Sequence, residues 1–214
     1  VSDADEACLV KLGGVIDEDN DLGGITDKVK SGSTLIDASD VERINSCGVR
    51  DWVTWLGDLD GKGCKVFFLE CSPAIMTQVN LVNNFLGNGS ILSFFSPYFC
   101  PSCEADKMLL IEVAEALENL PFEAPTCRCD QCDHTMEFDD IESSYFAFLN
   151  TIKPPDVDAK LAATIQRVST SDQGILRTRS MSLSMPGLTA TPSAPSTQTT
   201  PHSRDLKGLL ETQA

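Results

Sequence analysis

The sequence is poor in basic residues and in histidine, and it has no long apolar run. It contains 16 lysines and arginines against 32 aspartates and glutamates, and only 2 histidines. Residues 1–153 alone carry 27 acidic and 10 basic side chains, which disfavours non-specific binding to nucleic acids. No apolar stretch approaches the ~18 residues of a membrane span, and the N-terminal VSDADEACLV has neither a basic flank nor a leader-type core. We expect a soluble cytoplasmic protein without a membrane partner.

Catalytic groups are also scarce. His202 lies in a Ser/Thr/Pro-rich segment, so His134 is the one histidine within the first 153 residues. A nucleophilic pair would need Cys47 and His134 to converge from distant parts of the chain. The glycine pairs at 13–14 and 23–24 match no phosphate-binding loop. We therefore expect no enzyme.

The first hundred residues alternate between strand and helix patterns. Buried strands are predicted at 33–37 and 65–70, after a strand at 7–15 and a weak helix at 19–29. The clearest helix follows residue 48, where one apolar stripe contains Val49, Trp52, Val53, Leu56 and Leu59. Ser72-Pro73 opens the next helix, and residues 90–99 return as a strand. This order predicts an α/β sheet.

The character of the chain changes near residue 100, where cysteines begin to occur in close pairs. Residues 108–120 read as a strand followed by a helix, and residues 139–152 read as a helix. From residue 169 to 204 roughly half the side chains are Ser, Thr or Pro, which leaves too little apolar area to offset chain entropy. We expect residues 154–214 to form a disordered tail.

Serines in this tail follow basic residues. Ser180 directly follows Arg177-Thr178-Arg179 and Ser182 lies two residues further on, a pattern suited to basophilic Ser/Thr kinases. An unmodified linker is the alternative.

The 9 cysteines fall into two groups. Those at 8, 47, 64 and 71 are isolated. An isolated cysteine in a cytoplasmic protein is usually a small core residue. Two C-x-x-C pairs about 25 residues apart have the spacing of a tetrahedral zinc site. We predict a structural Zn²⁺ ion with Cys100, Cys103, Cys129 and Cys132 as ligands, and Cys127 and His134 lie close enough to replace one of them.

Redox chemistry is the alternative to the metal. Phe99-Cys100-Pro101-Ser102-Cys103 also has the pattern of a thioredoxin-type active site, in which the first thiol attacks disulfides. Such a site should open a helix directly, and it leaves Cys129 and Cys132 unexplained. Two structural disulfides would require an oxidising compartment.

Residues 7 to about 96 resemble the STAS domain, the fold of bacterial anti-sigma-factor antagonists and of the cytoplasmic tails of sulfate transporters. The motif is an apolar strand ending in Asp37, then Asn45-Ser46-Cys47-Gly48-Val49 leading into an amphipathic helix. The glycine turn, the strand at 65–70 and Ser72-Pro73 follow in the same order and spacing.

The resemblance implies a switch at this motif. In the antagonists the stretch reads Asp-Ser-Ser-Gly, and a kinase-type anti-sigma factor phosphorylates the second serine, which prevents binding to that kinase. The phosphoacceptor position is Cys47 here, and a thiol is no substrate for an ordinary serine kinase. Ser46 could accept phosphate one residue earlier, although we expect it to cap the helix. Cys47 itself is expected to be a small packing residue.

Together these features predict a STAS-like mixed sheet with helices at 1–96, a zinc-ribbon-like Cys₄ module at 97–153, and a disordered tail at 154–214. The expected function is non-catalytic protein–protein interaction in bacterial signalling or transcription control, with a kinase-type anti-sigma factor or another signalling protein as partner. A thiol-disulfide oxidoreductase using Cys100 and Cys103 is the alternative function.

Overall fold

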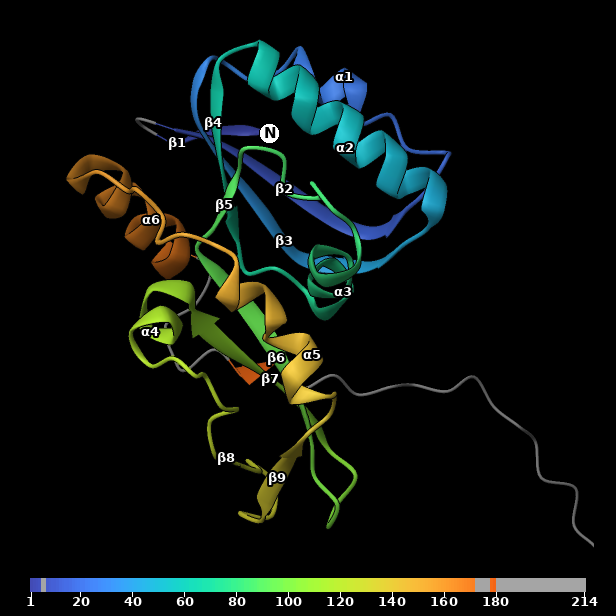
Figure 1. The fold of residues 1–214 in the computed structure, drawn as a ribbon, viewed down its shortest axis with the longest axis vertical. Coiled ribbons are helices and arrows are strands. Elements are labelled where there is room, and N and C mark those ends of the chain that lie inside the picture. Colours follow the sequence, from blue (N-terminus) through green and yellow to red (C-terminus); the bar gives the residue numbers. More distant parts are fainter. Residues whose placement is uncertain (5–6, 172–177, 180–214) are drawn as a thin grey trace, which may run out of the picture. The chain divides into compact units, whose positions relative to one another are not determined.

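The computed structural model describes residues 1–4, 7–171 and 178–179 (Figure 1). Its first sheet contains strands in sequential order: β1 (Ser2–Ala4), β2 (Ala7–Ile16), β3 (Gly32–Ile44), β4 (Cys64–Leu69) and β5 (Ser90–Ile91). Strands β2 to β5 are parallel, and β1 is antiparallel to β2. The predicted α/β fold class is confirmed.

One face of this sheet is covered by α1 (Gly23–Thr26), α2 (Ser46–Gly61) and α3 (Pro73–Leu81). The apolar stripe of α2 places Trp52 against Phe68 of β4, with ring centroids 5.9 Å apart. The Trp52 indole N–H donates to the Phe85 carbonyl at 2.9 Å, so this buried side chain is satisfied. The strong helix predicted after residue 48 is confirmed.

The opposite face of the sheet is covered by α6 (Ala159–Ser171). Phe67 and Leu69 of β4 point to this face and contact Leu161, because alternate residues of a strand face opposite ways. Asp158 starts the helix, since its Oδ1 accepts from the Leu161 N–H at 2.8 Å. The prediction of disorder is therefore wrong for residues 159–171. The apolar sheet face formed by Phe67 and Leu69 needs a cover. The apolar side chains of Leu161, Ile165 and Val168 on α6 provide it.

The second sheet is antiparallel, in the order β10-β7-β6-β9-β8. Its strands are β6 (Ser93–Phe99), β7 (Asp106–Glu112), β8 (Cys127–Arg128), β9 (Thr135–Phe138) and β10 (Thr178–Arg179). Helix α4 (Val113–Glu118) directly follows β7, which confirms the predicted strand-to-helix change.

The two sheets share side chains in one core. Cys71, just after β4, forms a parallel bridge with Phe94 of β6. Phe94, Val113 and Tyr145 belong to the same buried cluster as Trp52. Strand β6 (Ser93–Phe99) runs through residues 96 and 97, where the sequence predicted the boundary between the two modules. The packing is therefore continuous across that boundary.

Two helices are shorter than predicted. The segment 139–152 splits into α5 (Glu142–Tyr145) and a 3₁₀ helix, η1 (Ala147–Asn150). Asn80 of α3 binds this break on both sides, donating to the Tyr145 carbonyl at 2.9 Å and accepting from the Phe148 N–H at 3.0 Å. A tertiary contact thus replaces the helical hydrogen bonds that a continuous helix would have made. In the segment 19–29, only α1 is helical.

Candidate metal centre

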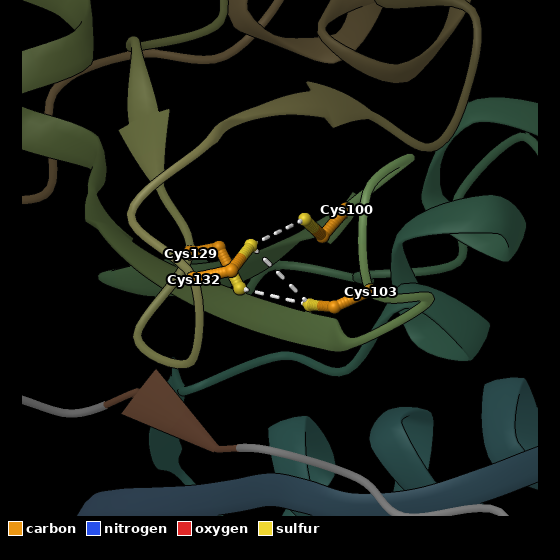
Figure 2. Close-up of side chains that lie close together, drawn as sticks. All are labelled: Cys100, Cys103, Cys129 and Cys132. Atoms are coloured by element: carbon orange, nitrogen blue, oxygen red, sulfur yellow. Dashed lines mark hydrogen bonds between the residues drawn. The ribbon is translucent and has the colours of Figure 1, made fainter.

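The first cysteine pair lies in a tight turn between β6 and β7, which we name knuckle 1 (residues 100–105). The Glu104 N–H donates to the Cys100 carbonyl at 2.9 Å, and the Cys100 N–H donates to the Ala105 carbonyl at 2.9 Å. Glu104 adopts a left-handed backbone with φ of 59°. The turn brings both thiols to its inner side (Figure 2).

The second pair lies in knuckle 2 (residues 129–134), between β8 and β9, and repeats the same geometry. The Asp133 N–H donates to the Cys129 carbonyl at 3.0 Å, and the Cys129 N–H donates to the His134 carbonyl at 2.9 Å. Asp133 has the same left-handed φ of 59°. Two turns with one hydrogen-bonding pattern therefore face each other, each with a C-x-x-C pair.

The four sulfur atoms converge at one point. All lie within 4.8 Å of one another, and the closest pairs join Cys103 to Cys129 at 3.4 Å and both Cys100 and Cys103 to Cys132 at 3.5 Å (Figure 2). A disulfide requires about 2.05 Å, so these thiols are not paired. A tetrahedral ion with bonds of about 2.3 Å places sulfurs about 3.8 Å apart, close to the observed spacing.

The main chain favours thiolates at this point. The N–H of Gln131 donates to the Cys129 sulfur at 3.4 Å, and this hydrogen bond lowers the pKa of Cys129 to about 6. The hydrogen bond to Cys129 raises the pKa of Cys103 to about 12. Cys103 therefore holds its proton more tightly than Cys129 does. A bound cation would take the place of such shared protons and let all four sulfurs ionise.

The predicted ligands are brought together, and the two nearby substitutes are not. Cys127 is buried beside the centre, but it is outside the group of four converging sulfurs. His134 is exposed, and its Nδ1 lies 3.4 Å from the Cys132 carbonyl. Within the described residues this is the one group of His, Cys, Asp and Glu side chains with metal-binding geometry.

Apolar side chains support the centre from the sheet. Tyr98, Cys127 and Met136 form a small buried cluster with Cys100 and Cys129. The Tyr98 hydroxyl donates to the Pro125 carbonyl at 2.6 Å, which ties β6 to the segment before knuckle 2. Cys100 is fully buried and Cys103 is exposed. Cys100 also begins a turn, not the helix that a thioredoxin-type site requires.

Cys47 lies elsewhere, in the first turn of α2, and its side chain is half-buried. The helix cap is Asn45, whose side-chain oxygen accepts from the Gly48 N–H at 2.8 Å. Our expectation that Ser46 caps α2 is therefore wrong, because Ser46 is already the first helical residue. Asn45, one position earlier, has the extended backbone that a cap needs. Asn45 also donates to Glu18 at 2.7 Å.

The predicted phosphorylation sites Ser180 and Ser182 lie outside the described residues. Among the helices of the described chain, none has the length and hydropathy to cross a membrane. Comparisons with protein-family models, curated proteins and solved structures find no match to this chain. The four-cysteine centre is thus the strongest functional observation, and its all-sulfur donor set fits a soft or borderline metal ion.

Proposed function

We propose that this chain is a non-catalytic protein-interaction module in bacterial signalling or transcription control, stabilised by a structural Zn²⁺ ion. The convergence of four thiols from two matching knuckles supports the structural ion, and the interaction role rests on the resemblance of residues 7 to about 96 to STAS-type antagonists. A Zn²⁺ ion held by four cysteines has no open position for substrate, and such closed sites are structural. The ion would join knuckle 1 to knuckle 2 beside the buried cluster that contains Tyr98, Cys127 and Met136.

Zinc is favoured over other ions by the donor set. Four thiolates suit zinc and iron, while calcium and magnesium require oxygen ligands. Elemental analysis of full-length protein purified without added metal should find about one tightly held zinc per chain. A metal-free protein that catalyses disulfide reduction would instead support the oxidoreductase alternative.

The interaction surface we propose is the β3–α2 junction around Cys47. This position corresponds to the phosphoacceptor of STAS-type antagonists, and Cys47 is partly accessible there. Arg50 and Asp51 form an ion pair at 2.9 Å on the same helix, so charged side chains lie near the thiol. The proposed partner is a kinase-type anti-sigma factor or a related signalling protein, bound constitutively because Cys47 cannot be phosphorylated as a serine is.

Partner capture with full-length protein tests this surface. A Cys47→Glu variant places a charge at the junction and should reduce binding to the captured protein at least tenfold. Ala163→Glu is the matched control, since Ala163 is exposed on α6, which covers the other face of the sheet. Equal binding by both variants, or captured proteins without a nucleotide-binding kinase domain, would contradict the proposal.

A further inference from the structure

A buried lysine lies beside the metal centre. Lys107 of β7 is 8% exposed, although lysine is almost never fully buried unless it is paired. Its Nζ donates to the Arg128 carbonyl at 3.0 Å and to Asp130 Oδ1 at 2.8 Å. Arg128 directly precedes knuckle 2, and Asp130 lies within it. Lys107 thus connects β7 to the turn that presents Cys129 and Cys132.

The charge around Lys107 explains why a cation is stable there. Residues 97–153 carry 12 acidic side chains and 3 basic ones. Burial by itself lowers the pKa of Lys107, but the hydrogen bonds and charges of Asp130 and Cys127 together outweigh this, and the pKa is raised overall. Lys107 therefore remains an ammonium ion. A divalent ion with four thiolates would add a net charge of minus two to the same region.

Another cation contacts knuckle 2 from the solvent side. Arg128 donates to the Asp133 carbonyl at 2.9 Å, and its ion pair with the Asp133 carboxylate is 3.5 Å long. The two side chains of this pair are 67% and 83% exposed, whereas the Lys107 side chain is 10% exposed. Exposed pairs are screened by water, whereas the Lys107 ammonium is largely shielded from it.

We propose that Lys107 is a positioning residue of the metal centre, which holds knuckle 2 in its metal-binding conformation and offsets part of the negative charge of the four thiolates. This inference rests on the proposed zinc site. Groups that orient metal ligands through hydrogen bonds change metal affinity by about 10- to 100-fold when they are removed. Lys107 acts here through the backbone of Arg128 and through Asp130, without touching the metal.

The experiment compares zinc release from full-length holo-protein into a chromogenic chelator. Lys107→Met should release zinc about tenfold faster than the unmodified protein or more, and Lys107→Arg should restore most of the difference. Lys65→Met is the matched control, because Lys65 forms a comparable 3.2 Å ion pair with Asp156 but is half-exposed and outside the centre. It should release zinc at the unmodified rate.

A spectroscopic measurement separates electrostatics from simple loss of stability. In the Co²⁺-substituted protein, a nearby ammonium lowers the energy of the thiolate electrons, so its removal should shift the sulfur-to-cobalt charge-transfer band to longer wavelength. Lys107→Arg and Lys65→Met should leave the band in place. An unshifted band in Lys107→Met, with unmodified release, would overturn the inference.

Two further outcomes are distinguishable. If Lys107→Met does not fold, Asp130→Ala replaces it, because Asp130 has a side chain 62% exposed and its truncation removes the carboxylate that accepts from Lys107. Faster release from Asp130→Ala supports the inference, and an unchanged rate overturns it. Normal release from a Lys107→Met protein that still holds one zinc leaves the proposed function standing, whereas an unmodified protein without any zinc overturns both.

Discussion

The main-chain carbonyl of Ile16, at the end of β2, lies directly against Gly48 in the first turn of α2. A Cβ at Gly48 would overlap the Ile16 carbonyl oxygen and lie 2.8 Å from its carbon. The same carbonyl accepts from the Asn45 N–H at 3.1 Å. The junction that carries Cys47 is therefore fixed by close backbone packing between a strand and a helix.

A methyl group at Gly48 should destabilise the fold. Gly48→Ala forces the start of α2 away from β2, and we expect a loss of about 2–3 kcal/mol in the free energy of unfolding. Gly57→Ala is the control on the same helix, since an added Cβ there meets nothing within 4 Å. It should stabilise the protein by up to about 1 kcal/mol. Urea unfolding monitored by Trp fluorescence measures both, and similar values for the two variants would contradict the packing described.

The helix cap gives a second prediction. Asn45→Ala removes the acceptor for the Gly48 N–H and should cost about 1 kcal/mol. Ser46→Ala changes a residue inside the helix and should cost little. The two variants are compared by the same urea titration, and a larger loss in Ser46→Ala would show that serine is the cap after all.

Metal binding should depend on the four converging cysteines and not on their neighbour. Cys129→Ser removes a ligand, and we expect it to lose the tightly bound metal and the ordered packing of the second sheet. Cys127→Ser is the control, because Cys127 is two residues away, is also buried, and lies outside the group of four converging sulfurs. It should retain one equivalent. Metal content and near-ultraviolet circular dichroism distinguish the variants, and metal loss in both would point to a different ligand set.

Tyr145 should make the protein sensitive to alkaline pH. Its hydroxyl is buried and donates to the Phe95 carbonyl at 2.5 Å. Burial raises its pKa above the ordinary value, with further contributions from the charges of Asp140 and Cys71. The unfolded chain therefore releases this proton at lower pH than the folded protein does. Stability from the neutral phenol is complete below pH of about 10 and falls as pH rises beyond it.

Tyr145→Phe removes this titration. The variant should be less stable at neutral pH by about 1–2 kcal/mol, because the Phe95 carbonyl loses its partner. It should then lose less additional stability than the unmodified protein between pH 9 and 11. Thermal unfolding across this range is the measurement. Parallel curves for the two proteins would show that Tyr145 does not titrate on unfolding.

Local pattern alone was enough to predict several elements. The stripe of Trp52, Leu56 and Leu59 specified α2, because a period of 3.6 residues leaves one apolar face. Ser72-Pro73 specified the start of α3, where the Ser72 side chain does accept from the Ile75 N–H. The cysteine spacing predicted the four converging sulfurs, because each C-x-x-C turn brings its own two thiols together.

Tertiary structure decided what spacing cannot encode. Whether residues 159–171 are helical depends on Phe67 and Leu69 presenting an uncovered sheet face, which no local window contains. The choice of Asn45 over Ser46 as cap depends on where β3 ends relative to Ile16. The sequence by itself determined which thiols could meet and which helix could bury Trp52, whereas the apolar stripe did not predict the burial of Trp55. Only the fold decided that Cys127 and His134 stay outside the centre and that Lys107 lies buried beside it, because those positions follow from tertiary contacts such as the hydrogen bonds of Lys107 with Arg128 and Asp130, more than 20 residues along the chain.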